Sequence, residues 1–264
     1  MATVLLIRHA TTAATGKRLG GRTDAPLDDA GRRQAMATAA RLADLPIRAV
    51  YASPLARTFE TAQIVAAPHR LKVRPCEDVI EIEYGRWTDR PLKPLTRNKL
   101  WAVIQARPSL VRFPDGETIR YAQLRAVDAL EEIAARHRSG IVAVVSHADI
   151  IKAIVAFYAG MPLDAFQRLY VGPSSVTVLA VSDGARPMLL RFNDEGPLQR
   201  QAFMRPRKPP PKKAPVKRAS RRGSPGAAAT GKGEELRSGL GSPRGEGGGA
   251  AATGGRESRK GGNG

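Results

Sequence analysis

Four side chains able to bind or attack an anion follow segments that are predicted to be strands. Arg8 and His9 end an apolar run at the N-terminus, and His147 ends a second apolar run. Arg57 lies one turn into a helix predicted after a third, shorter strand. Because ligands of such sheets bind just past the carboxyl ends of strands, we expect these side chains to converge on one crevice. Two guanidinium groups beside two imidazoles describe an anion site that contains a nucleophile.

The adjacency of Arg8 and His9 sets a condition on the backbone. In a regular strand, neighbouring side chains point to opposite faces of the sheet. Both can reach one crevice only if the chain leaves the strand at this point, which the small residues Ala10, Thr11 and Thr12 permit.

The elements that must position these residues alternate along the chain. The expected strands are residues 2–8, 47–52, 71–74, 140–146, 175–181 and 188–192. The expected helices are residues 29–44, 53–66, 92–106, 118–137 and 148–158. At the second helix, Ser53 is the expected cap and Pro54 the expected first helical residue. Strands alternating with helices predict an α/β fold, a three-layer α/β/α sandwich with a mostly parallel sheet.

Taken one at a time, the candidate residues have ordinary structural explanations. An Arg-His pair is often a polar pair at a strand end, and His147 could be a hydrogen-bonded histidine at a helix start. Arg57 could be a surface charge, and Glu81 lies in a segment with several other acids. No carboxylate cluster indicates a divalent metal, so no metal site is expected.

Six segments, in order, resemble the motifs of one known family. They are LLIRHATT (5–12), GRTDAPLDDAGRRQA (21–35), SPLARTFETA (53–62), EIEYGRW (81–87), FPDGET (113–118) and VVSHADII (144–151). Together they resemble the histidine phosphatase superfamily, the phosphoglycerate mutase-like proteins. The resemblance implies the phosphoglycerate mutase-like form of the fold and a phosphotransfer site that uses neither metal nor cofactor.

The resemblance also implies a role for each matching residue. His9 would attack phosphorus and carry the phosphoryl group as a phosphohistidine. Arg8 and Arg57 would bind the phosphate, and a protonated His147 would stabilise charge on its oxygens. Glu81 would protonate the leaving alkoxide and then help a water to attack.

Four positions depart from the family pattern. Ala10 lies where the family usually has Gly, and Thr11 replaces a frequent Glu. Thr15 lies where many members have an Asn that contacts phosphate, so we expect Thr15 to bind phosphate with its single hydroxyl donor. Asp149 lies in a segment where many members carry Gly.

The leading functional hypothesis is a phosphatase that acts on a small phosphorylated metabolite. A phosphomutase is the rival within the same chemistry, but the glycolytic mutases carry a longer insertion than this chain has between Trp87 and Phe113. A catalytically silent binding module is a third hypothesis, which the joint presence of the site residues disfavours. The substrate and the oligomeric state cannot be read from the sequence.

The C-terminal part of the chain differs in composition from the rest. Residues 201–264 contain 15 Lys or Arg against 4 Glu, which is +11 of the formal net charge of +19 and leaves +8 for residues 1–200. We expect a single domain over residues 1–200 and a disordered basic tail, rich in Pro, Gly, Ala and Arg, over residues 206–264. Such a tail suits weak, salt-sensitive contact with polyanions, and a nucleic-acid-associated protein is a fourth hypothesis.

Cellular location is inferred from what the sequence contains. Cys76 is the only cysteine, so neither an intramolecular disulfide nor a cysteine metal cluster is expected. The apolar run of residues 4–7 is too short for a signal peptide, and no segment approaches the length of a membrane span. We therefore expect a cytoplasmic protein with no membrane contact.

Overall fold

The structure is a computed structural model that describes residues 1–181 and 186–196. Its central sheet has six strands in the order β4-β3-β6-β1-β7-β8. The strands are β1 (Ala2–Arg8), β3 (Ile47–Ala52), β4 (Val73–Pro75), β6 (Ile141–Ser146), β7 (Val176–Val181) and β8 (Met188–Asp194). Strands β4, β3, β6 and β1 run parallel to one another, and β7 pairs antiparallel with both β1 and β8. The predicted mostly parallel sheet is confirmed.

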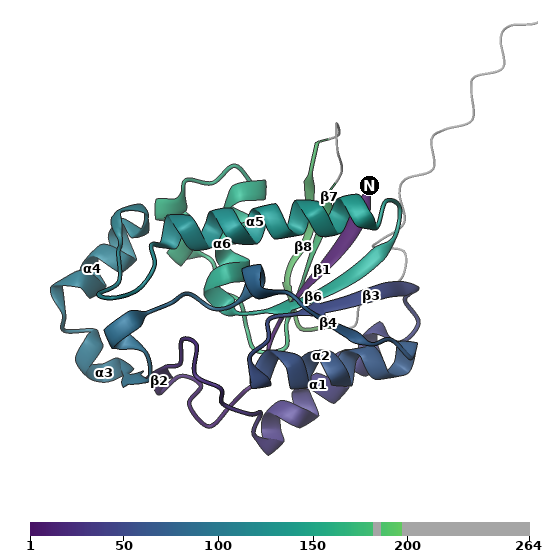
Figure 1. Cartoon of the computed structure of the whole chain (residues 1–264), viewed down its shortest axis with the longest axis horizontal. Coiled ribbons are helices and arrows are strands. Elements are labelled where there is room, and N and C mark those ends of the chain that lie inside the picture. Colours follow the sequence, from purple (N-terminus) through teal and green to yellow (C-terminus); the bar gives the residue numbers. More distant parts are fainter. Residues whose placement is uncertain (182–185, 197–264) are drawn as a thin grey trace, which may run out of the picture. The chain divides into compact units, whose positions relative to one another are not determined.

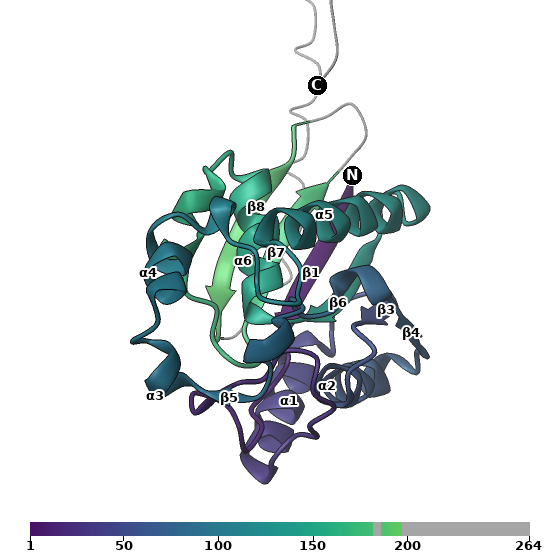
Figure 2. The ribbon, with the colours of Figure 1, turned by 60° about the vertical axis from the view of Figure 1, so that its left-hand side comes forward.

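Helices cover both faces of this sheet, as Figures 1 and 2 show. On one face lie α1 (Asp29–Leu42) and α2 (Ala56–Ala66), and on the other lie α5 (Ile119–Arg136) and α6 (Ala148–Tyr158). The short helices α3 (Leu92–Leu95) and α4 (Lys99–Ala106) follow a small sheet formed by β2 (Arg18–Leu19) and β5 (Arg90–Pro91). The three-layer α/β/α arrangement is therefore confirmed.

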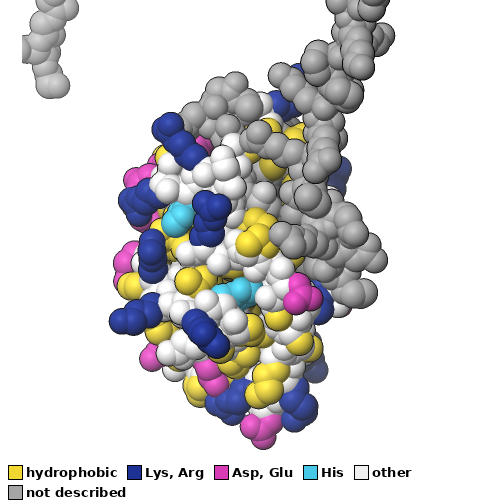
Figure 3. Space-filling model, turned by 90° about the vertical axis from the view of Figure 1, so that its right-hand side faces the viewer, with side chains coloured by type: hydrophobic (Ala, Val, Ile, Leu, Met, Phe, Trp, Pro, Cys, Tyr) yellow, Lys and Arg dark blue, Asp and Glu magenta, His cyan; other side chains and the backbone are white. Residues whose placement is uncertain are grey.

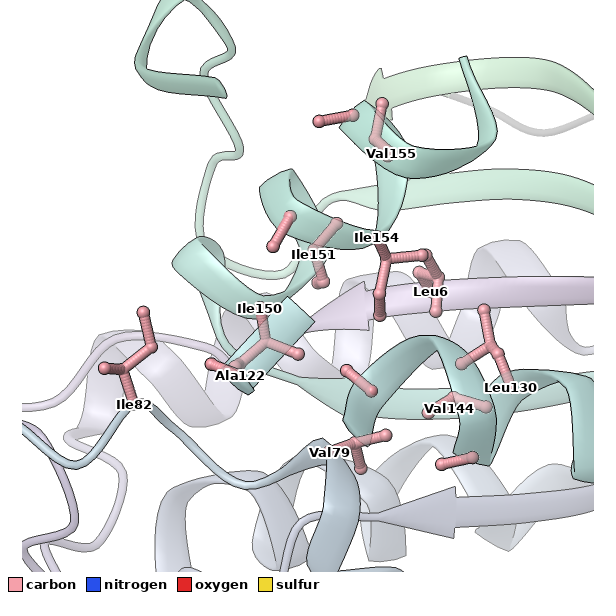
Figure 4. Packing of buried hydrophobic residues seen from close by; sticks show 14 of the residues in the cluster. Leu6, Val79, Ile82, Ala122, Leu130, Val144, Ile150, Ile151, Ile154 and Val155 are labelled. Carbon is pink, nitrogen blue, oxygen red and sulfur yellow. The ribbon is translucent and has the colours of Figure 1, made fainter. Parts of the chain in front are cut away.

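Strand β1 explains why the sheet needs cover on both faces. Leu5 and Ile7 belong to the apolar cluster that includes Leu42 of α1 and the buried face of α2. Leu6 belongs to the opposite cluster, where it lies near Leu130 of α5 and Ile154 of α6 (Figure 4). A strand buried on both faces reads as a continuous apolar run rather than an alternating one.

Two helix predictions differ from the structure. Helix α2 begins at Ala56 with Leu55 as its cap residue, because the Ser53 hydroxyl contacts His147 Nε2 at 2.8 Å instead of capping the helix. The helix predicted over residues 92–106 is two helices, because Asn98 caps α4 by accepting a hydrogen bond from the Leu100 N–H. Both differences come from polar contacts that override a local helix signal.

The cap residue of α1 is Asp28, and its side chain has a second partner. Asp28 Oδ1 accepts from the Gly31 N–H at 2.6 Å and from the Thr11 hydroxyl at 2.8 Å. The start of α1 is thereby tied to the loop that follows β1.

The surface of the described residues carries many basic side chains. On the face shown in Figure 3, Lys and Arg side chains lie in several separate places. Within residues 1–181 and 186–196, no helix is long and apolar enough to cross a membrane. The predicted domain boundary and the predicted disorder of residues 206–264 lie outside the described residues.

Candidate active site

One cavity lies at the carboxyl edge of the parallel strands. Arg8 is the last residue of β1, and His9 follows it outside the strand, so both side chains reach this cavity. The cavity has a volume of about 260 Å³. The sequence-predicted site residues that line it are Arg8, His9, Thr15, Arg57 and Glu81, joined by Tyr84 and Asp149. We call it the phosphate cavity below, after the ligand expected from the sequence.

The remaining predicted residue, His147, lies behind this cavity and does not line it. It is the cap residue of α6 and is 0% exposed. Its ring is 5.2 Å from that of His9, centroid to centroid, in an edge-on arrangement. His147 therefore contacts the wall of the cavity through Arg57, whose Nη2 lies 3.2 Å from His147 Nδ1.

The hydrogen bonds of His9 determine which of its nitrogens carries the proton. Nδ1 lies 2.7 Å from the carbonyl oxygen of Ala10, which can only accept, so Nδ1 carries the proton. Nε2 accepts a hydrogen bond from Arg57 Nε at 3.3 Å. Burial and the charges of Arg57 and Arg8 lower the pKa of His9 well below its ordinary value. His9 is thus a neutral imidazole with its lone pair on Nε2.

His147 is neutral for similar reasons. Its Nδ1 lies 3.2 Å from Arg57 Nη2, which can only donate, so Nδ1 accepts. Its Nε2 then carries the proton and donates it to the Ser53 hydroxyl. Burial and the charge of Arg57 lower the pKa of His147 well below its ordinary value. Burial and Arg57 therefore favour the neutral form of His147, and the protonated His147 expected from the resemblance stays a prediction.

Arg57 contacts the rings of both His9 and His147. Its guanidinium donates to the carbonyl oxygens of Gly21, at 2.6 Å, and Thr23, at 2.7 Å, and to both rings. Arg8 is fixed in the same way by the carbonyl oxygen of Val171 at 2.7 Å. Arg8 Nε is buried and has no hydrogen-bond partner among residues 1–181 and 186–196.

Glu81 has the environment of an acid that holds its proton near neutral pH. Burial and the charge of Asp149 raise its pKa to about 7, against the opposing charges of Arg57 and Arg8. Its Oε1 accepts from the Ile82 N–H at 3.0 Å, and its Oε2 lies 3.9 Å from His147 Nδ1. A carboxyl group in this condition can donate a proton at pH 7 and recover it afterwards.

Asp149 is the second carboxyl group of the cavity, and it is held differently. Burial pushes its pKa upward, but the Lys152 ammonium at 2.7 Å and the Tyr84 hydroxyl at 2.9 Å bring the pKa below its ordinary value. Burial and the charge of Asp149 raise the pKa of Tyr84, so its hydroxyl keeps its proton and donates. The pKa values of Glu81 and Asp149 are thus shifted in opposite directions, and Asp149 forms a direct ion pair with Lys152 at 2.7 Å.

Thr15 lines the phosphate cavity, but its hydroxyl is engaged by its own loop. Thr15 Oγ1 accepts from the Thr12 N–H at 2.9 Å and lies 3.2 Å from Thr12 Oγ1. These contacts close the turn after His9.

A buried ion network that positions Glu81 was not predicted from the sequence. Glu117 Oε1 accepts from Arg125 at 2.7 Å and from the Glu83 N–H at 2.8 Å. Arg125 in turn donates to the carbonyl oxygen of Glu81 at 3.3 Å. The signal for Glu117 was its place in the FPDGET segment, but its partners come from distant parts of the chain.

Two glycines allow the 81–87 and 113–118 segments to approach this closely. Gly85 has φ +53°, and a Cβ there would clash with the carbonyl oxygen of Pro114. A Cβ on Gly116 would clash with the carbonyl oxygen of Glu83. The two motif segments therefore pack backbone to backbone. This packing holds in place the irregular segment of residues 81–87, which carries Glu81.

No group of three or more His, Cys, Asp or Glu side chains in the described part of the chain is arranged to hold a metal ion. The cationic groups of the cavity are arginines, which bind anions through paired N–H donors.

The fold and the site define an α/β protein with a buried, arginine-lined anion pocket around a neutral histidine. The chain belongs to the histidine phosphatase superfamily (branch 1), whose family model matches residues 4–195. The resemblance stated from the sequence motifs is confirmed.

Relatives with assigned names include both phosphatases and mutase-like proteins. The chain is 28% identical over 199 residues to phosphoserine phosphatase 1 of Hydrogenobacter thermophilus, covering 73% of this chain and 92% of the relative. It is 29% identical to phosphoglycerate mutase-like protein 4 of Arabidopsis thaliana, covering 77% of this chain and 90% of the relative. Among solved structures, Bacillus stearothermophilus YhfR matches with a TM-score of 0.69 and 29% identity, covering 74% of this chain and 98% of the other.

Proposed function

We propose that this protein is a metal-independent phosphomonoesterase that acts on a small phosphorylated metabolite through a phosphohistidine at His9. The observation that carries the proposal is the state of His9, a neutral ring whose unprotonated Nε2 faces the guanidinium of Arg57. A nucleophilic imidazole must have a free lone pair, and an arginine beside it can hold the anion that the lone pair attacks.

Arg8 and Arg57 bind the phosphate in this proposal. A phosphomonoester carries nearly two negative charges, which two guanidinium groups offset. Carbonyl oxygens of Val171, Gly21 and Thr23 hold these groups in place before substrate arrives, so little ordering is needed on binding.

Substrate binding also frees the nucleophile. Arg57 Nε donates a hydrogen bond to the His9 lone pair. A phosphate oxygen competes for that donor, and once it accepts the hydrogen bond the lone pair of Nε2 is available to attack phosphorus. Recognition of the phosphate and activation of His9 are then one event.

The reaction proceeds in two steps. In the first, a bond forms between His9 Nε2 and phosphorus, the ester P–O bond breaks, and Glu81 gives its proton to the leaving oxygen. In the second, Glu81 takes a proton from water as the water oxygen bonds to phosphorus and the P–N bond breaks. Inorganic phosphate and the free alcohol are the products.

In this proposal His147 is neutral before substrate binds and gains a proton when the phosphate dianion binds. A phosphate dianion beside Arg57 favours the protonated form of His147, because a nearby anion raises the pKa of an imidazole. His147 then stabilises the additional charge on the phosphoryl oxygens.

A phosphomutase is the second candidate function, and the mutase-like relatives favour it. The two activities differ only in the acceptor of the phosphoryl group, water or a second substrate alcohol. The deciding experiment screens sugar phosphates, phosphoglycerates, phosphoserine, nucleotides and cofactor precursors, with His9→Ala as blank. Release of inorganic phosphate at the rate of substrate loss supports the phosphatase, and isomerised substrate without phosphate release supports the mutase.

We further propose that the basic tail contributes only a weak contact with polyanions. Truncation after Arg205 is expected to leave the melting temperature nearly unchanged, because the Pro-Lys-Arg and Gly-rich sequence of residues 206–264 cannot form a core. At low salt the charge of +11 in residues 201–264 raises the association rate of anionic substrates in the full chain.

That kinetic advantage should fade as the Debye length falls to about 10 Å at 0.1 M salt. The measurement is a thermal melt and a salt series of kcat/KM for the full and truncated chains. A melting temperature lower by several degrees, or activity lost at high salt, would place the domain boundary elsewhere. RNA binding at low salt that survives truncation would assign nucleic-acid contact to residues 1–205.

A further inference from the structure

A second cavity adjoins the phosphate cavity. It has a volume of about 220 Å³ and shares three lining residues with the phosphate cavity, Leu19, Tyr84 and Asp149. Its other lining residues are Trp101, Ile104, Gln105, Phe113, Lys152 and Gln167. Because these three residues line both cavities, the second cavity lies beside the space next to Arg8 and Arg57, and we call it the alcohol cavity.

The walls of the alcohol cavity are apolar and aromatic, with amides among them. Trp101 and Ile104 come from α4, and the Phe113 ring packs edge-on against Tyr84 at 4.8 Å between centroids. Gln105 and Gln167 supply side-chain amides, which can both donate and accept hydrogen bonds. Apolar walls with a few such polar groups suit a ring that carries hydroxyl groups.

The charges of the two cavities are already balanced. Lys152 is paired with Asp149 at 2.7 Å and donates to Gln167 at 2.9 Å. Arg18, at the mouth of the phosphate cavity, is paired with Asp89 at 2.6 Å. Arg8 and Arg57 are then matched by the two charges of the phosphate itself.

A further anionic group on the alcohol would therefore find no unmatched cation among the described residues that line the two cavities. It would also meet the Asp149 carboxylate on the shared wall. Like charges held in a partly buried site repel each other strongly.

We propose that the alcohol cavity binds the leaving group of the substrate, and that this group is an uncharged, hydroxylated ring such as a sugar. The inference rests on the proposed phosphomonoesterase function and narrows its substrate class. It separates this chain from enzymes of phosphoglycerates, whose alcohol carries a carboxylate.

The first test compares kcat/KM on hexose and pentose phosphates with kcat/KM on 3-phosphoglycerate and phosphoserine. We expect kcat/KM for the best sugar phosphate to exceed kcat/KM for either acidic substrate by at least roughly tenfold. A factor of this size is about what one mismatched buried interaction costs. An acidic substrate that is turned over equally well or better overturns the proposal.

The second test adds a cation to the alcohol cavity. Gln105 is exposed at its surface end, so Gln105→Lys leaves the core of α4 intact. The variant is expected to shift the ratio of kcat/KM for 3-phosphoglycerate over sugar phosphate by about fivefold toward the acid, the effect of one partly exposed ion pair. Ala102→Lys is the matched control, because Ala102 is exposed on the same helix and does not line the cavity.

An unchanged ratio in Gln105→Lys, or an equal shift in both variants, contradicts the assignment of the cavity. Trp101→Ala gives an independent readout. It should raise KM for the sugar phosphate while the inhibition constant of inorganic phosphate, which occupies only the phosphate cavity, stays the same.

Hydrolysis of p-nitrophenyl phosphate separates this inference from the proposed function. If the wild-type protein hydrolyses that ester and His9→Ala does not, the proposed phosphomonoesterase function is supported. This conclusion does not depend on the substrate ratio measured for Gln105→Lys. If neither protein hydrolyses any phosphate ester, the function itself is wrong.

Discussion

Replacing His9 by Ala is expected to lower kcat/KM on every phosphate ester by about 10⁴-fold or more, the scale on which removing a covalent nucleophile acts. The structure gives the reason, because the lone pair of His9 Nε2 is the unprotonated nitrogen held beside Arg57. Brief incubation with ³²P-labelled substrate should give acid-labile, base-stable label on the His9 peptide of the wild-type protein and none in the variant.

His137→Ala is the control for this experiment. His137 contacts the Tyr51 hydroxyl at 3.0 Å, away from the phosphate cavity, so its loss should leave both label and turnover in place. Label on another residue, or substantial activity in His9→Ala, would falsify the assignment of the nucleophile.

Replacing Glu81 by Gln is expected to slow hydrolysis of alkyl phosphates by roughly 10²–10⁴-fold and of p-nitrophenyl phosphate far less. A poor leaving group needs the proton of Glu81, whereas nitrophenolate leaves without it. The wild-type kcat/KM on alkyl esters should fall as the pH rises through about 7, where Glu81 loses its proton. That alkaline limb should be absent in the variant. Equal losses on both classes of ester would mean that Glu81 positions the phosphate instead.

Stability measured against pH gives the control for Glu81→Gln. The folded pKa of about 7 lies above the ordinary value of 4.5, so the folded protein binds this proton more tightly than the unfolded chain. The contribution of Glu81 is complete below about pH 4.5 and is lost as the pH rises through 7. Gln cannot ionise, so the variant should gain stability relative to the wild type over this range. A variant destabilised at pH 8 would mean that its lost activity reflects unfolding.

The sheet and most helices were predictable because their signals are local. The apolar run of β1 and the caps Asp28 and Thr118 each act within a few residues of the chain. Ser53 shows where local reasoning fails, since its sequence context is a helix start but its hydroxyl is used by His147. Local sequence patterns do not indicate whether the Ser53 hydroxyl caps the helix or contacts His147, which lies 94 residues away in the chain.

The site was predictable as a set of residues and not as a set of contacts. Motif matches pointed to Arg8, His9, Arg57 and Glu81, and the structure brings these four side chains to one cavity. The hydrogen-bond partners of His147 could not be predicted, because one of them is a donor from α2.

The hydrogen bond from Arg57 to His9 has a consequence for chemical selectivity. A reactive imidazole can be modified irreversibly by electrophiles that carry no phosphate. In the resting protein such a molecule meets a lone pair already occupied by the Arg57 Nε–H, on a ring that is only 7% exposed. An anion that accepts the Arg57 Nε–H in place of His9 leaves the nitrogen free. We therefore expect the N–H that Arg57 offers to phosphate also to shield His9 from alkylation and acylation by other reagents.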